Sequence, residues 1–174
     1  MAGKHRAQVL ADLIKANDLK NGAEIGVGSG PTSRALLEHF PNLSWIAVDH
    51  WPAGFMLHPP SRGAITEADQ KRVRASYMTV FAQFSPRLRL IEKPTVDAAA
   101  DIEDGSLDLV FIDANHTYEG CRDDILAWRP KLRAGGWLTG HDYFPEAFPG
   151  VVKAVDELVP GFKLEGDYVW MAQI

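Results

Sequence analysis

The sequence predicts a single α/β domain over residues 1–174, built on a doubly wound, mostly parallel sheet that ends in an antiparallel β-hairpin. Apolar strand-like runs alternate along the chain with segments of helical periodicity, which is the pattern of a parallel sheet covered by helices on both faces. Polar residues and glycines follow the predicted strand ends. Two short apolar runs then flank Glu165, Gly166 and Asp167, which is typical of a terminal hairpin.

The first elements form a β-α-β unit. Apolar residues recur every three or four positions from Ala7 to Asn17, which predicts a helix with one buried face. The run at Ala23–Val27 predicts a buried strand that leads into a glycine turn, and a helix is expected from Pro31 to Phe40. The run at Leu43–Val48 predicts the second strand.

The remaining elements continue the alternation. The expected helices are Glu67–Phe84, Asp97–Ile102, Tyr118–Leu132 and Val151–Val159, and the expected strands are Leu88–Glu92, Leu107–Ile112 and Trp137–Gly140, followed by a hairpin of Phe162–Leu164 and Tyr168–Ala172. A turn at Ala134–Gly136 is expected to stop the helix before the last parallel strand. Residues Trp51–Gly63 contain three prolines and predict a loop.

Composition and charge restrict the partners. The chain has 174 residues, with 18 Lys+Arg and 23 Asp+Glu and a net charge of -5. Because it contains no Lys/Arg run, we expect neither nucleic acid nor a membrane surface as partner, and a small neutral or cationic ligand fits better. The single cysteine, Cys121, excludes an internal disulfide and predicts buried packing. Neither a signal peptide nor a membrane span is recognisable, so we expect a cytoplasmic protein.

Polar residues gather where the predicted strands end. Ligands of open α/β sheets bind beyond the carboxyl ends of the strands, so these positions are the candidate site. Any one of them could be a helix cap or turn residue, but the whole set is poorly explained in that way. They are Gly26, Gly28, Ser29 and Gly30 after the first strand, Asp49 and His50 after the second, Asp113, Asn115 and His116 after the fourth, and His141 and Asp142 after the fifth.

The glycine turn favours a nucleoside ligand over a nicotinamide dinucleotide. The dinucleotide fingerprint GxGxxG would require glycine where this chain has Pro31. Glycines let a backbone approach a ligand closely, and Asp49, 19 residues beyond Gly30, can accept hydrogen bonds from both ribose hydroxyls.

These segments resemble the class I S-adenosylmethionine-dependent methyltransferases of small-molecule type. The resemblance rests on EIGVGSG, on Asp49, on LDLVFID and on LRAGGWLTGHDY, and it extends from about Asn21 to Ile174. The segments FIDANHTYEG and GHDY are similar to the metal-dependent O-methyltransferase-like branch. The resemblance implies a Rossmann-like sheet whose last strand is antiparallel.

The resemblance also implies the cofactor site. Glu24 would hold the methionine part of S-adenosylmethionine, the glycines would pass beneath it, and Asp49 would bind the ribose. Residues Glu92–Thr95 would border adenine, although Lys93-Pro94-Thr95 departs from the acidic residue that the family often has there. The implied cofactor-binding residues are Glu24, Gly26, Gly28, Ser29, Gly30, Asp49, His50 and Asp113.

A divalent cation is a further implication. The metal-dependent enzymes place a carboxylate after the fourth strand and an acid pair after the fifth, where this chain has Asp113 and His141-Asp142. Asp113 and Asp142 could offer oxygen ligands to Mg²⁺ or a similar ion, and His141 or His116 would shift the preference towards a softer ion. Alternatively, Asp113 contacts the methionine part or caps a helix, and His116 forms local hydrogen bonds.

We therefore expect an enzyme that moves a methyl group to oxygen or nitrogen of a small-molecule acceptor. His116 or His141 would act as the base, and residues Trp51–Gly63 would form a lid over the acceptor. Two alternatives stay open, a nicotinamide-dependent oxidoreductase and a non-catalytic nucleoside-binding regulatory protein. The sequence leaves the oligomeric state undecided and allows a homodimer.

Overall fold

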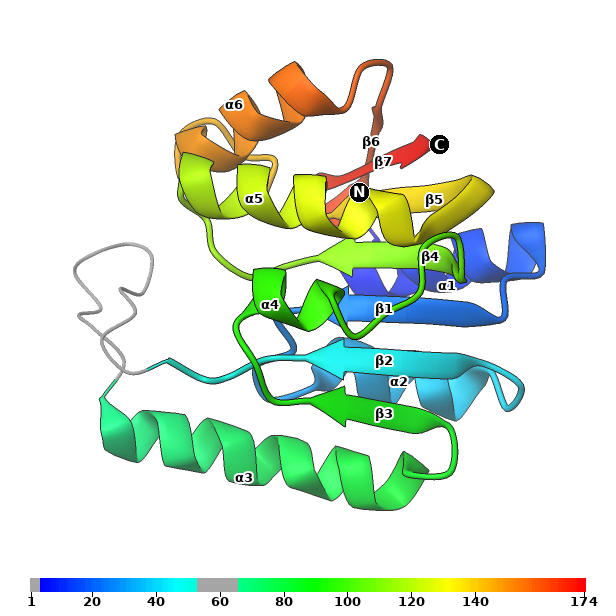
Figure 1. Cartoon of the computed structure of the whole chain (residues 1–174), viewed down its shortest axis with the longest axis vertical. Coiled ribbons are helices and arrows are strands. Elements are labelled where there is room, and N and C mark those ends of the chain that lie inside the picture. Colours follow the sequence, from blue (N-terminus) through cyan, green and yellow to red (C-terminus); the bar gives the residue numbers. More distant parts are fainter. Residues whose placement is uncertain (1–3, 53–65) are drawn as a thin grey trace.

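The computed structural model describes residues 4–52 and 66–174, which form a seven-stranded sheet in the order β3-β2-β1-β4-β5-β7-β6 (Figure 1). The strands are β1 (Asn21–Ile25), β2 (Ser44–Val48), β3 (Leu88–Ile91), β4 (Leu107–Ile112), β5 (Leu132–Gly140), β6 (Lys163–Glu165) and β7 (Val169–Gln173). The helices are α1 (Arg6–Asn17), α2 (Pro31–His39), α3 (Glu67–Phe84), α4 (Thr95–Ala99), α5 (Tyr118–Trp128) and α6 (Pro149–Leu158). Short 3₁₀ turns cover Arg129–Lys131 and Gly166–Tyr168.

The sheet has the predicted mostly parallel character and antiparallel ending. Strands β1 to β5 pair in parallel, whereas β7 pairs antiparallel with β5 and β6 pairs antiparallel with β7. The carboxyl ends of the parallel strands therefore meet at one edge, on the left in Figure 1. This edge is where the sequence places the candidate site.

Helices cover both faces of the sheet, and β4 shows why. Every residue of this strand is buried, and successive side chains of a strand point to opposite faces. Leu109 and Phe111 accordingly join the apolar core beneath α1, α2 and α3. Val110 and Ile112 join the core beneath α4, α5 and α6, which also buries Cys121 as predicted. The two cores fix the sheet between two layers of helices.

Two elements begin earlier than expected. The predicted strand Ala23–Val27 is wrong by two residues, because Gly26 has a φ of +88° and ends the extended run after Ile25. The predicted helix Asp97–Ile102 begins at Thr95 instead and ends at Ala99. Proline cannot donate a backbone hydrogen bond but fits immediately before a first turn, so α4 starts directly after Pro94.

The expected helix Tyr118–Leu132 and the expected strand start at Trp137 are both wrong. Helix α5 ends at Trp128 and tightens into a 3₁₀ turn that contains Pro130, which lacks the N–H that another α-helical bond would need. Leu132 already pairs with the start of β4, so β5 begins there. The predicted turn at Ala134–Gly136 lies inside β5, where the register with β4 shifts.

The terminal hairpin is confirmed with slightly different bounds, β6 and β7 joined by the turn at Gly166–Tyr168. Within this turn Asp167 and Tyr168 have φ angles of 59° and 55°, which non-glycine residues adopt rarely. Most of the predicted lid, residues 53–63, lies outside the described residues.

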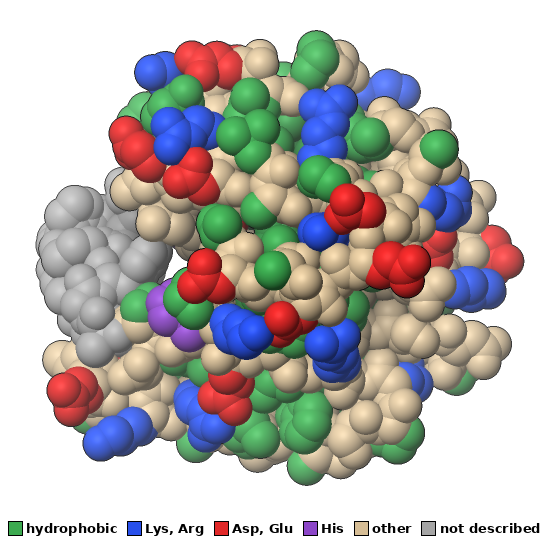
Figure 2. Space-filling model, in the orientation of Figure 1, with side chains coloured by type: hydrophobic (Ala, Val, Ile, Leu, Met, Phe, Trp, Pro, Cys, Tyr) green, Lys and Arg blue, Asp and Glu red, His purple; other side chains and the backbone are tan. Residues whose placement is uncertain are grey.

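Two surface properties complete the fold. None of the helices in the described ranges combines the length and apolar character that a membrane crossing requires. Figure 2 shows one face of the molecule, on which basic and acidic side chains are interspersed and neither sign forms a large patch.

Candidate functional site

A cavity of about 600 Å³ lies at the carboxyl ends of β1, β2 and β4. It brings together seven residues of the predicted strand-end set, which are Gly26, Gly28, Asp49, His50, Asp113, Asn115 and His116. Its wall is completed by Trp51, Pro52, Gln70, Val73, Pro94, Thr95, Val96 and Ala114. Another hollow of similar volume, about 590 Å³, is lined by Ser44, Arg87 and Ser106 at the opposite edge of the sheet. Because ligands of parallel sheets bind beyond the carboxyl ends of the strands, the first cavity is the candidate site.

The three glycines of the turn have different structural roles. A Cβ atom on Gly26 would lie 2.4 Å from the backbone oxygen of Asp113, and one on Gly30 would lie 2.7 Å from the ring of Tyr77. These two glycines therefore allow close packing of the chain. At Gly28 the φ is +53° and a Cβ would meet no atom within 4 Å. Only Gly28 thus leaves open space where its side chain would stand.

Asp49 links the tip of β2 to the glycine turn. Its Oδ2 accepts a hydrogen bond of 2.9 Å from the backbone N–H of Gly28, and its Oδ1 accepts one of 2.7 Å from the N–H of Trp51. The indole of Trp51 donates in turn to the Gly28 carbonyl, at 2.8 Å. Each carboxylate oxygen can accept a further bond. Asp49 can therefore receive ligand hydroxyls from the cavity side.

Trp51, the first residue of the predicted lid, has a buried side chain. Its side chain is 5% exposed and its ring centroid lies 5.7 Å from that of Tyr77 on α3. The indole packs against α3 and the glycine turn, and Trp51 also lines the cavity, so the lid expected at Trp51–Gly63 stays a prediction. The other large apolar residues of that segment lie outside the described residues.

Glu24 is separated from the cavity. Its side chain is 2% exposed, and its carboxyl accepts a hydrogen bond from the Ser33 hydroxyl of α2. Burial raises the pKa of Glu24 to about 8, although the Ser33 bond opposes this effect. Neither Glu24, Ser29 nor Gly30 is among the residues that line the cavity. Their predicted contacts with a cofactor stay predictions.

The predicted adenine border is divided between the cavity and the surface. Pro94 and Thr95 line the cavity together with Val96. Glu92 instead forms a bidentate ion pair with Arg74, with both N–O distances at 2.7 Å. Lys93 pairs with Asp101 at 2.6 Å. The apolar part of this segment therefore faces the cavity, and its charged part faces solvent.

The tips of β4 and β5 bring together Asp113, His116, His141 and Asp142, which we call the Asp–His cluster. His116 Nε2 lies 2.7 Å from Asp142 Oδ2 and 3.8 Å from Asp113 Oδ1. His141 Nδ1 lies 3.0 Å from Asp142 Oδ1 and 3.6 Å from Asp113 Oδ1. Ligand atoms of Asp113, His141 and Asp142 lie within 4.8 Å of one another, as the ligands of one metal ion would.

The charges of the cluster stabilise one another. Burial lowers the pKa of both histidines, but hydrogen bonding to Asp113 and Asp142 outweighs it, so the pKa of His116 rises to about 9 and that of His141 to about 10. Burial would raise the pKa of Asp142, yet the two histidines hold it well below its usual range. At neutral pH both histidines therefore keep a proton in this state. The predicted base must release that proton before it can accept one from an acceptor.

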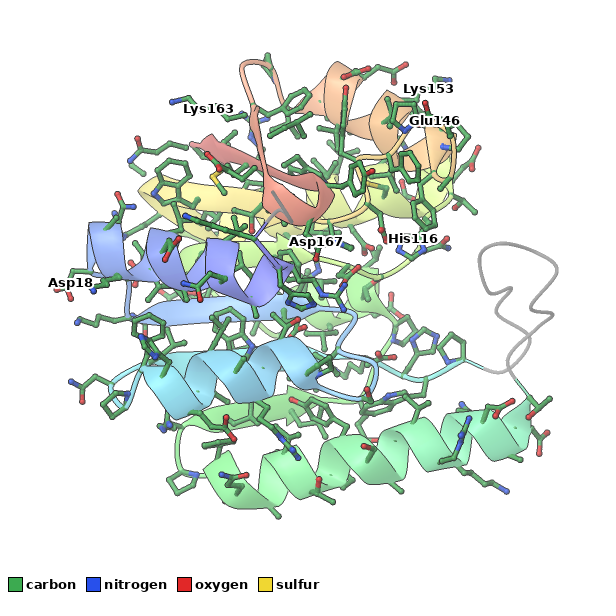
Figure 3. The ribbon with its side chains drawn as sticks, turned by 180° about the vertical axis from the view of Figure 1, so that it is seen from behind. Asp18, His116, Glu146, Lys153, Lys163 and Asp167 are labelled. Carbon is green, nitrogen blue, oxygen red and sulfur yellow. The ribbon has the colours of Figure 1, made fainter. Side chains whose placement is uncertain are left out.

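Two residues of the site were missed by the sequence analysis, and they come from opposite ends of the chain. Arg6, at the start of α1, places its Nε 3.7 Å from Asp113 Oδ2. Asp167, in the hairpin turn, places its Oδ2 3.5 Å from His141 Nε2. Figure 3 shows Asp167 beside the start of α1, at the same end of the sheet as His116. No local pattern predicts these contacts, because they join segments that are far apart in the sequence.

Comparisons with known proteins agree with this geometry. Residues 23–143 match the family model described as a methyltransferase domain. An uncharacterised protein, y4gI, of Sinorhizobium fredii (strain NBRC 101917 / NGR234) is 39% identical over 54 residues. The match covers 31% of this chain and 6% of that protein, so the chain spans a small part of the curated relative's length.

Three solved structures share the fold at low sequence identity. A candidate caffeoyl-CoA O-methyltransferase from Staphylococcus aureus has a TM-score of 0.69 and 17% identity, covering 98% of this chain and 83% of that one. The O-methyltransferase NovP has a TM-score of 0.68 and 16% identity, covering 96% and 77%. The SAH-bound methyltransferase PaMTH1 from Podospora anserina has a TM-score of 0.66 and 18% identity, covering 98% and 78%. The chain therefore belongs to the methyltransferase-domain family, and its fold is that of the class I S-adenosylmethionine-dependent methyltransferases.

Proposed function

We propose that this protein transfers a methyl group from S-adenosylmethionine to an oxygen or nitrogen atom of a small-molecule acceptor. The observation that carries the proposal is the cavity in which Gly28 and Asp49 face open space beside the Asp–His cluster. Family membership supports methyl transfer as the reaction class. The SAH-bound neighbour supports the choice of methyl donor.

The residues of the cavity fit the proposed donor. A Cβ at Gly28 would stand in space that a nucleoside could fill, and the carboxylate of Asp49 can accept hydrogen bonds from ribose hydroxyls. Pro94, Thr95 and Val96 offer an apolar wall to a flat base. When bound, the sulfonium compound supplies an electrophilic methyl group. The protein's part is then to align the acceptor for in-line attack.

The Asp–His cluster is the proposed acceptor end of the cavity. His116 lines the cavity, whereas the His141 side chain is 9% exposed and is not among the lining residues. His116 is therefore the better placed of the two to exchange a proton with an acceptor. We also propose that Asp113 and Asp142 bind a divalent cation, which when bound would lower the pKa of an acceptor hydroxyl.

Binding of the donor is tested with a matched pair of glycine variants. We expect Gly28→Ala to weaken binding of S-adenosylmethionine at least tenfold in calorimetry, because the added methyl group enters the ligand's space. Gly161→Ala is the control, since Gly161 has a φ of +76° and also has no atom within 4 Å of its Cβ position. Both variants carry the same kind of backbone strain, so their thermal stabilities should fall by similar amounts. Unchanged affinity in Gly28→Ala would contradict the proposed binding mode.

Turnover is tested by an acceptor screen with labelled methyl donor, in the presence and absence of chelator. We expect chelation to abolish transfer and to leave donor affinity largely intact. Full methyl-transfer activity without metal would contradict the proposed cation site at Asp113 and Asp142. Binding of the donor with no transfer to any acceptor would favour the regulatory alternative, and binding of NAD in its place would favour the oxidoreductase.

A further inference from the structure

Thr95, which lines the cavity at the start of α4, is held by two side chains of α5. The two helices pack beside each other on the same face of the sheet and share one apolar core (Figure 1). The indole of Trp128 donates a hydrogen bond of 3.0 Å to the backbone oxygen of Thr95. Asp124 lies one turn earlier on the same side of α5, and its carboxyl interacts with the Thr95 hydroxyl. Helix α5 therefore holds Thr95 by both its backbone and its side chain.

Asp124 places a carboxyl group where α5 otherwise buries apolar side chains. Its side chain is 1% exposed, and both of its carboxyl oxygens are enclosed. Burial raises the pKa of Asp124 to about 6, and the Thr95 hydroxyl opposes that rise. The group is therefore charged at pH 8. An aliphatic side chain would fill the same space without the cost of burying a charge, so packing alone does not account for a carboxyl here.

The contact with Asp124 determines which way the Thr95 hydroxyl donates. A hydroxyl group has one proton and two lone pairs, whereas an ionised carboxylate can only accept hydrogen bonds. The proton of Thr95 Oγ1 is therefore used by α5, and the lone pairs are left for a ligand in the cavity. Pro94 and Val96, on either side, have no polar side-chain atom. Thr95 thus adds one hydrogen-bond acceptor to a wall that is otherwise apolar.

The nearby charged side chains are already paired. Glu92, at the tip of β3, forms the bidentate ion pair with Arg74, and Lys93 pairs with Asp101. A ligand that offers an N–H group to this wall would therefore meet the Thr95 hydroxyl more readily than a free carboxylate. An amino group on a flat purine has this chemistry.

We propose that Asp124 is a positioning residue that turns the hydroxyl proton of Thr95 away from the cavity, so that Thr95 Oγ1 accepts a hydrogen bond from the 6-amino group of the bound purine. The pair would make the cavity select an aminopurine over a purine without that group. The inference rests on the proposed function, because it names how the base of S-adenosylmethionine is recognised.

The test measures by calorimetry at pH 8 how strongly the full chain distinguishes two ligands. One is S-adenosylhomocysteine, and the other is the same compound with hydrogen in place of the 6-amino group. We expect the parent chain to bind the first about tenfold more tightly, because only its amino group can donate to Thr95. Asp124→Asn should reduce this ratio to below about threefold, because an asparagine amide can itself donate to the Thr95 hydroxyl and free its proton.

Variants of Thr95 separate positioning from a general effect on folding. Thr95→Val has nearly the same shape without the hydroxyl and should bring the ratio close to one, whereas Thr95→Ser should keep the ratio of the parent chain. In the Thr95→Val background, Asp124→Asn should change the ratio no further, because its effect passes through the hydroxyl. The matched control is Asp123→Asn, since Asp123 is the next residue of α5 but pairs with Arg122. It should keep the ratio of the parent chain.

Three outcomes would overturn the inference. The first is an Asp124→Asn variant that loses affinity for both ligands but keeps the parent's ratio, because Asp124 would then only support the fold. The second is a parent ratio near one, which would leave the proposed function intact. The third is an equal ratio in Thr95→Val and Thr95→Ser, which decides the question even if Asp124→Asn does not fold. A parent chain that binds neither ligand would refute the proposed methyl donor and this inference together.

Discussion

The buried carboxyl of Glu24 should make the stability of the fold depend on pH in a way that one substitution removes. Burial raises its pKa to about 8 in the folded chain, whereas the ordinary value of a glutamate is 4.5. Between these two values the folded chain holds a proton that the unfolded chain has released. The perturbation is Glu24→Gln, which keeps the size and the neutral charge of the protonated side chain but cannot titrate.

The sign and the size of the effect follow from the two pKa values. The stabilising contribution of the protonated group is fully present below pH 4.5 and is lost as the pH rises to about 8. Each pH unit within this window costs about 1.4 kcal/mol of unfolding free energy. From about pH 5 to about pH 7.5 the loss attributable to Glu24 is about 3 kcal/mol.

The assay is urea denaturation of the parent chain and of Glu24→Gln across this pH range. We expect the variant to gain about 3 kcal/mol relative to the parent as the pH rises, because only the parent must bury a charge or retain a proton. Glu38→Gln is the control, since Glu38 lies exposed on the same helix as Ser33. Parallel pH profiles for the parent chain and Glu24→Gln would refute the reasoning, because they would show that Glu24 is charged in the folded protein.

Three further substitutions test the packing and the site. Gly26→Ala should destabilise the fold by about 2 kcal/mol or more, because its Cβ would overlap a backbone oxygen of the β4 tip at 2.4 Å. If Gly26→Ala has the same melting temperature as Gly28→Ala, the backbone next to Gly26 moves aside and the expected clash is relieved. Asp49→Asn should weaken S-adenosylmethionine binding at least tenfold, because it loses charge-assisted hydrogen bonds of about 1.5–3 kcal/mol each. If calorimetry shows that this variant binds the donor as tightly as the parent chain, Asp49 does not bind the ribose. Asp108→Ala should cost about 3 kcal/mol in urea denaturation, because Asp108 accepts two backbone N–H bonds of 2.8 Å and pairs with an arginine. Asp104→Ala, at an exposed ion pair, should cost under about 1 kcal/mol, and equal costs would contradict this distinction.

The sequence by itself determined the fold class and most of the cavity wall. Alternating apolar runs and helical periodicity reflect local geometry and burial, so the elements could be placed to within a few residues. The parallel order then brought Gly28, Asp49, Asp113 and His116 to one edge, because the strand ends of such a sheet meet there. The errors came where a local feature outweighed periodicity, as Pro130 did at the end of α5.

Only the tertiary structure decided what each polar residue faces. Glu24 lies next to the glycine turn in sequence, yet its strand directs it beneath α2, away from the cavity. Arg6 and Asp167 contact the Asp–His cluster although they lie near opposite ends of the chain, and the periodicity of the sequence does not predict such contacts. The charge state of His141 likewise depends on the carboxylate of Asp113, which only folding brings within 4 Å of its ring. Local pattern fixes the elements, but the direction of a side chain and the electric field around it depend on packing between distant segments.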